Sequence, residues 1–448
     1  MLLTETASRA MTDKLLGFVT ADDAVVRVSS EAFSHLRFAA NTFLTSGQRD
    51  GVTANVTVWI GRRRGSSGTT DLSDAALKQA VEDAQTFAKL APVDIEYLPT
   101  LGQQAYKPGQ GYVEATANIS LTGRARQISE AIAQSEKAGV IGAGFHQVSL
   151  RTRASGTARG NFHYERRSVV SLGMTARTPD GGGSGYFRRN HFDVSQLDTA
   201  RVAREAIRRG VESRGARELP AGTYPVILEA QAVSDILSAG AFSFDARNAD
   251  EGRSAFSAPG GTTKVGSPIF DSRINIVSDP WRPELSVFTA TDEGVPAQAM
   301  HLVRDGTLET LRYSRYWAQQ KNKPPSGPFA PIVESSAAGT SIEEMIRTAK
   351  RALLVTRFFY IRTVDPRSAS VTGLTRDGVW YIENGEIKYP VRNFRFNQSI
   401  IRMLGPGNVD LIGVPERVAS SENDGTDPVV VPALRLNAFN FTSQSDAV

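Results

Sequence analysis

The sequence predicts an α+β protein of two domains, with antiparallel sheets and flanking helices in the N-terminal half and a strand-rich C-terminal domain. Two observations support this prediction. The chain has 448 residues, more than a single hydrophobic core usually organises. Its first half alternates period-two strand patterns with amphipathic helical patterns, whereas its second half is mostly short strands. A polar segment that contains Pro220 separates the halves, so we place the domains at residues 1–217 and 218–448.

The N-terminal half contains two similar blocks of strands, each followed by a helix. Strand patterns occupy residues 23–70 and 140–190, and we expect turns at Gly47 and at Asp50-Gly51. Each block ends in a Gly/Ser-rich tip, Gly65–Gly68 and Gly181–Gly185, which we interpret as a flexible turn. The repeated pattern predicts a weak internal duplication. Helices are expected at residues 6–19, 73–90, 126–138 and 194–213, with a long Pro- and Gly-rich connection at 91–120.

The C-terminal half contains two hairpin signals among several short strands. Asp305-Gly306 and Asn384-Gly385 are each flanked by strand residues, as in two-residue hairpin turns. Residues 321–331, KNKPPSGPFAP, follow no regular pattern and predict an exposed loop. Strands are expected at residues 224–228, 274–277, 287–291, 301–304, 307–311, 379–382 and 386–391, and helices near 231–240, 341–350 and 396–404.

The composition is that of an ordinary globular protein and argues against several functional classes. Hydrophobic residues make up 40% and charged residues 22%, with a formal net charge of +4. Short basic clusters such as Arg166-Arg167, Arg188-Arg189 and Arg208-Arg209 fit solvated turns and helix faces better than a nucleic-acid site. The N-terminus lacks a signal-peptide pattern, and no long apolar run suggests a membrane span. Because the chain also has no cysteine, we expect a cytoplasmic protein that binds neither nucleic acid nor membrane.

No set of residues forms a recognisable catalytic or metal-binding motif. None of the histidines has another histidine at i+4 or lies beside a glutamate in a helical pattern. The sequence has no G-x-S-x-G motif, and the adjacent carboxylates Asp292-Glu293 would point to opposite faces of a strand. We therefore predict no catalytic residue and no metal ligand. The alternative that stays open is a metal site built from the distant histidines His35, His146, His163, His191 and His301.

One stretch of the second half has the form of a site. Residues 226–256 combine a short apolar strand, a helix with one buried face and the polar turn Asp250–Ser254. With other segments in the same order, this stretch resembles the TldD/PmbA family, also called TldD/TldE. The segments that carry the resemblance are YPVILEAQAVSDILSAG at 224–240, EGRSAF at 251–256, residues 276–296 with DEGVP at 292–296, LVRDGTLETLRY at 302–313, VTGLTRDGVWYIENGEIKYPV at 371–391 and residues 402–413. In the first half, RFA at 37–39 with Asn41 and residues 65–70 fit the same pattern more loosely.

The resemblance implies a two-domain α+β protein that dimerises around an internal chamber. In the catalytic members of the family, an HExxxH helix supplies two zinc ligands and a general base, and a cysteine supplies a further ligand. The corresponding segment here is SAGAFS, so Ser238 and Ser243 stand near the histidine positions and Ala239 stands near the glutamate. Because zinc needs several protein ligands, this degenerate segment is similar to the TldE/PmbA type, which has no zinc motif.

We therefore expect a non-catalytic subunit of a TldD/TldE-type zinc metallopeptidase that processes unfolded peptides or peptide precursors. The resemblance implies a heterodimer, with zinc in the TldD-like partner and an extended peptide as substrate. Two other hypotheses stay open: a homodimeric peptide-binding protein without peptidase activity, and a hydrolase with an unrecognised site. The residues that we select as candidates for the substrate cleft, although ordinary turn and strand-end structure is their simpler interpretation, are Gly252, Arg253, Ser254, Asp292, Glu293 and Gly294.

Overall fold

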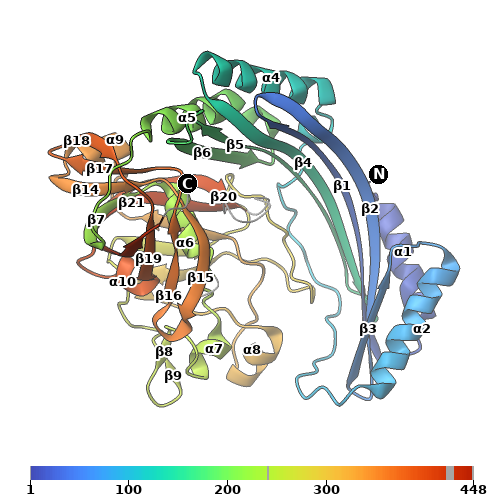
Figure 1. Cartoon of the computed structure of the whole chain (residues 1–448). Helices are drawn as coiled ribbons and strands as arrows, with labels where there is room; N and C mark the ends of the chain where they lie inside the picture. Colours follow the sequence, from blue (N-terminus) through green and yellow to red (C-terminus); the bar gives the residue numbers. More distant parts are fainter. Residues whose placement is uncertain (1, 240–241, 420–427, 446–448) are drawn as a thin grey trace.

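The computed structural model describes residues 2–239, 242–419 and 428–445. A six-stranded sheet from the N-terminal half arches over a second, larger sheet that is built from residue 222 onward (Figure 1). The predicted α+β class is confirmed, as are the antiparallel N-terminal sheet with flanking helices and the strand-rich C-terminal half. No helix in the described ranges is both long and apolar enough to cross a membrane.

The N-terminal half has one order of elements twice: a helix, a three-stranded meander and a second helix. The strand order β3-β2-β1-β4-β5-β6 joins the two meanders at their first strands, and every neighbouring pair is antiparallel. The first set is α1 (Glu5–Phe18), β1 (Asp23–Ala39), β2 (Thr42–Ile60), β3 (Arg63–Thr69) and α2 (Asp74–Leu90). After the short α3 (Glu114–Ala117), the second set is α4 (Leu121–Lys137), β4 (Ile141–Thr157), β5 (Phe162–Arg177), β6 (Ser184–His191) and α5 (Thr199–Glu212).

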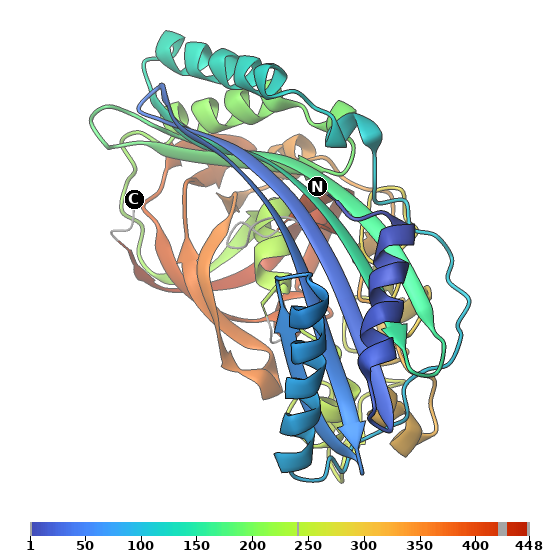
Figure 2. The ribbon, with the colours of Figure 1, turned by 90° about the vertical axis from the view of Figure 1, so that its right-hand side faces the viewer.

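The two faces of the N-terminal sheet differ because successive side chains of a strand point to opposite sides. One face is apolar: Val26 and Val56 pack against α1 and α2, and Val148 and Leu172 pack against α4 and α5. Figure 2 shows α1 and α2 on the outer side of the arch. The strand register brings a second set of side chains to the other face, which we call the polar face and which bears Arg27, Glu31, Phe33, Arg37, Arg49, Phe145, Gln147, Ser149, Arg151, Arg153, His163, Glu165, Arg167 and Arg188.

Two glycines allow helices to approach the apolar face closely. A Cβ atom at Gly65 would lie within 3.0 Å of the backbone of α2, and one at Gly185 would lie within 3.0 Å of the backbone of α5. The prediction that Gly65–Gly68 forms a flexible turn is therefore wrong, because the whole segment lies inside β3. In the second tip, Gly181 has a positive φ of 71° and lies in a turn, but Gly185 belongs to β6.

The hairpin between β1 and β2 turns at Ala40-Asn41 instead of at the predicted Gly47 or Asp50-Gly51, which lie inside β2. The φ angles of Ala40 and Asn41 are 49° and 57°, as the two central residues of a type I′ turn require. The side-chain oxygen of Asn41 accepts a hydrogen bond from the backbone N–H of Gly142 at 2.6 Å. Gly47 provides room for the ring of His35 on the neighbouring strand, so its role is packing across the sheet.

The C-terminal half forms a 13-stranded sheet with the long strand β21 (Pro428–Gln444) at its centre. This strand pairs with β7, β13, β19 and β20, and its Phe439 and Phe441 pack in a large apolar core. The other elements are β7 (Gly222–Leu228), α6 (Ala230–Leu237), α7 (Ala246–Asp250), β8 (Ser257–Ala258), β9 (Thr262–Thr263), β10 (Ile274–Ser278), β11 (Met300–Arg304), β12 (Thr307–Leu308), α8 (Arg315–Lys321), β13 (Pro331–Ser335), α9 (Ile342–Arg347), β14 (Arg351–Val355), β15 (Phe358–Asp365), β16 (Ser370–Thr375), β17 (Val379–Glu383), β18 (Glu386–Pro390), β19 (Phe394–Ser399), α10 (Ile400–Met403) and β20 (Val409–Ala419).

The local predictions for this half are confirmed at its hairpins and wrong at two other places. Asp305-Gly306 and Asn384-Gly385 connect paired strands and have positive φ angles. The strand expected at 287–291 is absent from this described segment, because the backbone N–H of Thr289 donates to the carboxylate of Glu165 in β5 at 2.7 Å. The helix expected near 396–404 begins only at Ile400, since the residues before it pair as strand β19.

Candidate functional site

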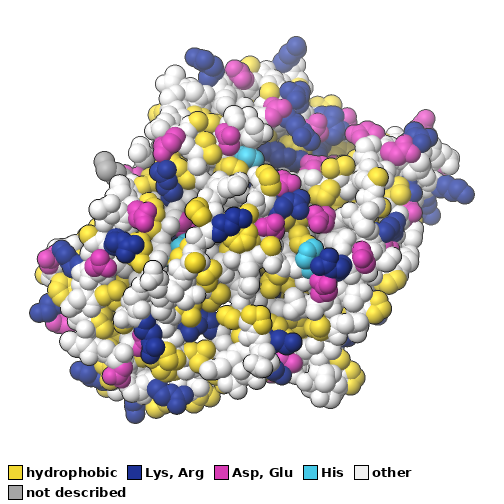
Figure 3. Space-filling view, turned by 180° about the vertical axis from the view of Figure 1, so that it is seen from behind, with side chains coloured by type: hydrophobic (Ala, Val, Ile, Leu, Met, Phe, Trp, Pro, Cys, Tyr) yellow, Lys and Arg dark blue, Asp and Glu magenta, His cyan; other side chains and the backbone are white. Residues whose placement is uncertain are grey.

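Buried arginines join the two halves of the molecule. Arg209 of α5 pairs with Glu229 after β7 at 2.7 Å, and Arg189 of β6 pairs with Glu416 of β20 at 2.9 Å. Burial, with a smaller contribution from the charge of Arg167, lowers the pKa of Arg417 to about 9. The interpretation of the basic clusters as solvated is therefore wrong for Arg167 and Arg209, which are buried. On the face of the molecule that Figure 3 shows, basic, acidic and hydrophobic side chains are interspersed.

The three acids of the stretch 226–256 that precede its closing turn all have structural partners. Glu229 pairs with Arg209, as described above. The buried carboxylate of Asp235 accepts hydrogen bonds from the side chain of Gln231 at 2.9 Å and from the backbone N–H of Phe358 at 3.0 Å. Asp245 accepts from the backbone N–H of Asn248 at 2.7 Å and so caps α7. These contacts account for the three carboxylates as parts of the fold.

A cavity of about 590 Å³ lies where the C-terminal end of α6 faces the polar face of the N-terminal sheet. We call it the interdomain cavity. Its walls are both cationic and apolar, a combination that suits a ligand with carboxylates and apolar side chains. The described residues that line it are Arg153, Arg167, Leu237, Ser238, Ala239, Phe242, Ser243, Phe244, Ile276, Val287, Phe288, Ala290, Thr291, Asp292, Arg312, Pro328, Phe329, Pro331, Val333, Pro428, Val429 and Val431.

Arg153 is the best-anchored cation of the interdomain cavity. Its guanidinium pairs with Asp292 at 3.0 Å and with Glu165 at 3.4 Å, and it donates to the backbone carbonyl of Ala290. The ring of Phe288 lies under both Arg153 and Arg167, with guanidinium-to-ring distances of 4.3 and 4.8 Å. The segment around residue 288 is thus attached to the sheet by charge and by ring contacts, and it forms one wall of the cavity.

Arg312 provides a further cation, from the C-terminal half of the chain. Its guanidinium lies 4.5 Å from the ring centre of Phe329, and its Nε is buried without a hydrogen-bond partner among the described residues. Burial lowers the pKa of Arg312 from its usual value, so this charge is poorly solvated. A buried donor without a partner is costly. An anionic ligand in the interdomain cavity would supply the missing acceptor.

Behind Arg153, a histidine and a glutamate lie close together on β5. The Nδ1 atom of His163 is 3.7 Å from the carboxylate of Glu165. Burial, and to a lesser extent the charge of Arg153, lowers the pKa of His163 to about 4. Burial raises the pKa of Glu165, although Thr289 donates to its carboxylate from both its backbone and its side chain. Near neutral pH the imidazole is therefore uncharged.

The residues of the interdomain cavity do not fit a zinc ion. The described lining has no histidine or cysteine and has a single carboxylate, Asp292, which already pairs with Arg153 and with Arg27 at 3.3 Å. The other ionisable groups of that lining are arginines. Within the described ranges, no three His, Cys, Asp or Glu side chains are grouped so that they could hold a metal ion. Zinc sites in proteins use three or four such ligands.

The structure brings together some of the residues selected from the sequence. Ser238, Ala239, Ser243 and Asp292 all line the interdomain cavity, whereas Gly240 and Ala241 of the same segment lie outside the described residues.

The other cleft candidates lie elsewhere. Glu293 lines a neighbouring hollow of about 320 Å³ and is 4.0 Å from Arg315. Gly294, with a φ of 80°, accepts a hydrogen bond from the Tyr106 hydroxyl at 2.8 Å. Gly252, Arg253 and Ser254 form the turn between α7 and β8, where Arg253 is exposed and pairs with Glu251.

Sequence reasoning did not find the arginines of the interdomain cavity. Arg153 and Arg167 come from strands of the first half, and Arg312 follows a hairpin of the second. The one local signal was the alternation of Arg151 and Arg153 in β4, which places both on one face of a strand. That signal does not reveal which face meets the other domain.

A comparison with family models finds that residues 221–443 match the model described as PmbA/TldA metallopeptidase C-terminal domain. Among curated proteins, the "Metalloprotease PmbA homolog" of Haemophilus influenzae is 23% identical over 441 residues, which cover 93% of this chain and 92% of that protein. The matched family region contains α6 and most of the residues that line the interdomain cavity.

Two solved structures have a similar fold over nearly the whole chain. TldE from Thermococcus kodakarensis superimposes with a TM-score of 0.84 at 16% sequence identity, covering 97% of this chain and 99% of that one. A Thermotoga maritima protein described as a candidate modulator of a DNA gyrase gives a TM-score of 0.83 at 17% identity, covering 97% of this chain and 100% of that one. At these identities, the similarity establishes the fold alone.

Proposed function

Because the chain belongs to the TldD/PmbA metallopeptidase family, we propose that it is a non-catalytic subunit of a TldD/TldE-type peptidase complex. In this proposal, a zinc-bearing relative supplies the catalytic centre. This chain completes the chamber around an extended, unfolded peptide. The observation that carries the proposal is the chemistry of the interdomain cavity, whose described lining contains Ser238, Ala239 and Ser243 together with arginines and has no histidine or cysteine.

The side chains that could act as metal ligands or as a general base support a binding role for this chain over a hydrolytic one. Metal-dependent peptide hydrolysis needs a metal held by protein ligands and a base that activates water. Asp292 is paired with Arg27 and Arg153, so it is not available as a free carboxylate. His163 and Glu165 lie behind Arg153, and no third potential ligand within the described ranges joins them. We therefore assign no catalytic residue and no cofactor to this chain.

Its arginines and aromatic rings suit the retention of a peptide. Arg153 and Arg312 line the interdomain cavity from the two halves of the chain, and Phe242, Phe244 and Phe329 belong to its apolar lining. A peptide carboxylate near Arg312 would satisfy the buried Nε that has no partner among the described residues. Apolar side chains of the same peptide would replace water along the phenylalanines. Both contributions favour an extended chain, whose side chains are accessible.

Co-purification and activity measurements test the proposal. This chain should co-purify with an HExxxH-bearing relative from the same cell, and the mixture should hydrolyse an unstructured peptide. Alone, each subunit should show at most a small fraction of that activity, and zinc analysis should find the metal only in the relative. Chelator-sensitive hydrolysis by this chain alone, with stoichiometric zinc, would contradict the proposal.

A matched pair of variants tests the role of the interdomain cavity. Arg312→Gln keeps most of the side-chain volume and removes the buried charge, so we expect peptide hydrolysis by the complex to fall about tenfold. Arg304→Gln, at an exposed arginine of β11 that pairs with Glu309 at 2.8 Å, is the control and should leave hydrolysis unchanged. Equal peptide hydrolysis by complexes with either variant would contradict a role of the interdomain cavity in binding the peptide.

The second candidate function is a homodimeric peptide-binding protein without peptidase activity. The observation in its favour is that both the cations and the apolar wall of the interdomain cavity come from this one chain. Size-exclusion chromatography with and without the co-expressed relative separates the two candidates. A heterodimer supports the subunit role. A homodimer that persists in the presence of the relative supports the second candidate.

A further inference from the structure

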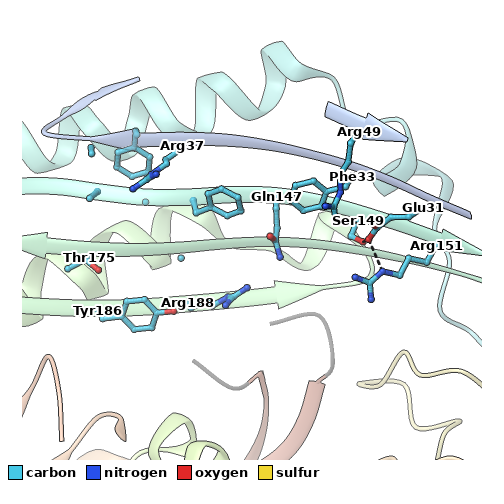
Figure 4. A pocket seen from close by; sticks show the side chains of 16 residues that line it. Glu31, Phe33, Arg37, Arg49, Gln147, Ser149, Arg151, Thr175, Tyr186 and Arg188 are labelled. Atoms are coloured by element: carbon cyan, nitrogen blue, oxygen red, sulfur yellow. Dashed lines mark hydrogen bonds and ion pairs between the residues drawn. The ribbon is translucent and has the colours of Figure 1, made fainter. Parts of the chain in front are cut away.

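A second hollow lies farther along the polar face, away from α6. It measures about 610 Å³, and β1, β2, β4, β5 and β6 all contribute to it. We call it the arginine groove, after Arg37, Arg49, Arg151 and Arg188, which line it. Figure 4 shows Arg49, Arg151 and Glu31 gathered near one end, with Arg37 toward the other end and Arg188 on the far strand. Neither the degenerate zinc segment nor any cleft candidate lies in this groove.

The described lining of the arginine groove has more arginines than carboxylates. Glu31 is the one carboxylate in its described lining, and it pairs with Arg49 and with Arg151, each at 3.0 Å. Arg151 and Arg188 have further partners of their own, whereas Arg37 and Arg49 are exposed to solvent. Arg37 is exposed and makes no ion pair or side-chain hydrogen bond with any residue of the described ranges. A surface of this kind attracts anions.

The spacing of the cations suits a chain of carboxylates better than a single small anion. The register places Glu31 opposite Arg151 and Arg37 opposite Phe145. Arg37 and Arg151 are therefore separated by six strand positions, or roughly 20 Å. Arg188 lies on β6, across β5 from β4. An extended peptide of roughly six residues spans such a distance, whereas one phosphate or carboxylate reaches only one of these cations.

We propose that the arginine groove binds acidic segments of extended peptides. This inference rests on the proposed function in one respect, that peptide is the ligand, and it adds the substrate class. Arg151 and Arg153 are two positions apart on β4, so one face of the strand connects the arginine groove with the interdomain cavity. A peptide whose acidic segment lies in the groove would extend from there toward the cavity. The groove thereby selects peptides before they reach the catalytic subunit.

The rings of the arginine groove favour a peptide over a single-stranded nucleic acid. Nucleic-acid grooves combine cations with aromatic rings on which bases stack. Here the ring of Phe33 is covered by Arg49 at 5.0 Å, and that of Phe145 is stacked on His35 at 5.1 Å. One face of each of these two rings is thus already occupied by a neighbouring side chain, whereas the exposed Arg37 and Arg49 are accessible to carboxylates.

Fluorescence anisotropy of the full chain, without any partner, tests the inference. The probe is a short labelled peptide rich in Glu, and its control is the same peptide with every Glu replaced by Gln. We expect the Glu peptide to bind about tenfold more tightly than the Gln peptide. Because exposed charges are screened by salt, the difference should shrink as ionic strength rises. Equal binding of the two peptides, or tighter binding of an oligothymidylate, would overturn the inference.

Charge-reversal variants locate the bound peptide. Arg37→Glu combined with Arg49→Glu changes two exposed residues of the arginine groove and should weaken binding of the Glu peptide about tenfold. Arg126→Glu combined with Arg204→Glu makes the same change of net charge on exposed positions of α4 and α5, and should leave binding within about twofold. Thermal melting of both double variants verifies that they fold. Equal loss of binding in the two would contradict the inference.

This assay separates the inference from the proposed function. It needs no catalytic partner, so a chain that binds the Glu peptide but never associates with a peptidase would contradict only the subunit role. A chain that associates with a peptidase and shows no preference for the Glu peptide would contradict only the arginine groove as an acidic-peptide site.

Discussion

The two faces of the N-terminal sheet are formed by the same strands but have different roles: one is buried against helices, and the other bears charged side chains. On the apolar face, Val56 and Leu172 are buried against helices. On the polar face, Arg37 and Arg49 are exposed, and Arg153 and Arg167 line the interdomain cavity. The hydrophobic effect favours burial of the first face, whereas the charges of the second contribute little to stability when they are exposed. Successive residues of one strand point to opposite faces, so one set of alternate residues can stabilise the fold while the other set is available to bind a ligand.

The largest effect that we expect from this comparison is on acid stability. His146 and His163 point to opposite faces of the sheet, and burial lowers their pKa values to about 3 and about 4. The unfolded chain takes up a proton at each histidine near pH 6.5, whereas the folded chain does so only at the lower values. Stability is therefore complete above pH 6.5 and falls as pH decreases through that value, by on the order of 3 kcal/mol per histidine at pH 4.

Urea unfolding at pH 7 and at pH 4.5 of the wild type, His146→Gln and His163→Gln measures this effect. Each variant should lose less stability on acidification than the wild type does. The reductions for the two variants should be similar, because both folded-state pKa values lie below pH 4.5. An acid sensitivity that neither substitution changes would show that these histidines are not its source.

The next largest effect on the free energy of unfolding is expected for glycine-to-alanine substitutions on the two faces of the sheet. Gly185→Ala places a Cβ against the backbone of α5, so we expect a loss of about 2 kcal/mol in the free energy of unfolding. Gly51→Ala is the matched control in β2, where a Cβ would meet no atom within 4 Å. Its stability should be unchanged or slightly higher, because alanine restricts the unfolded chain. Chemical denaturation compares the two. Equal destabilisation by both would contradict the close helix contact at Gly185.

The smallest effect on stability is expected at Asp292. This carboxylate is 60% exposed and pairs with Arg153 at 3.0 Å, so Asp292→Asn should cost less than about 1 kcal/mol. The same change removes the carboxylate that competes with a ligand for Arg153. Affinity for the Glu peptide should therefore rise severalfold, measured by anisotropy. A suitable control is Asp74→Asn, because Asp74 forms an exposed ion pair with Lys14 far from the cavity. A substitution of Asn190 would be a poor control, because Arg417 donates a hydrogen bond to this residue.

Local structure followed well from the sequence where a short motif determines it. Ser73 caps α2 by accepting from the backbone N–H of Ala76, and Asp305-Gly306 forms the expected hairpin turn. Packing roles were missed because they depend on distant residues. Gly65 was interpreted as part of a flexible turn, and its actual neighbours belong to α2, about twenty positions later in the chain.

The candidate site was predictable only in part, for the same reason. Ser238 and Ser243 were selected through the family resemblance, as the residues near the histidine positions of the zinc motif, and they do line the interdomain cavity. Arg153 joins them only through the packing of one domain on the other, which no local pattern encodes. Likewise, residues 287–291 have the composition of a strand, yet Thr289 bonds to Glu165 of β5 instead of to a neighbouring strand. Side-chain partners from another domain override strand propensity there.

Photo-crosslinking tests most directly the claim that the polar face carries the peptide. Phe145 lies on this face and is 36% exposed, and Phe87 lies on α2, on the opposite side of the sheet, and is 52% exposed. A photoreactive phenylalanine analogue at position 145 should capture the labelled Glu peptide, and the same analogue at position 87 should capture little of it despite its greater exposure. Capture at position 87 equal to or stronger than capture at position 145 would contradict the account.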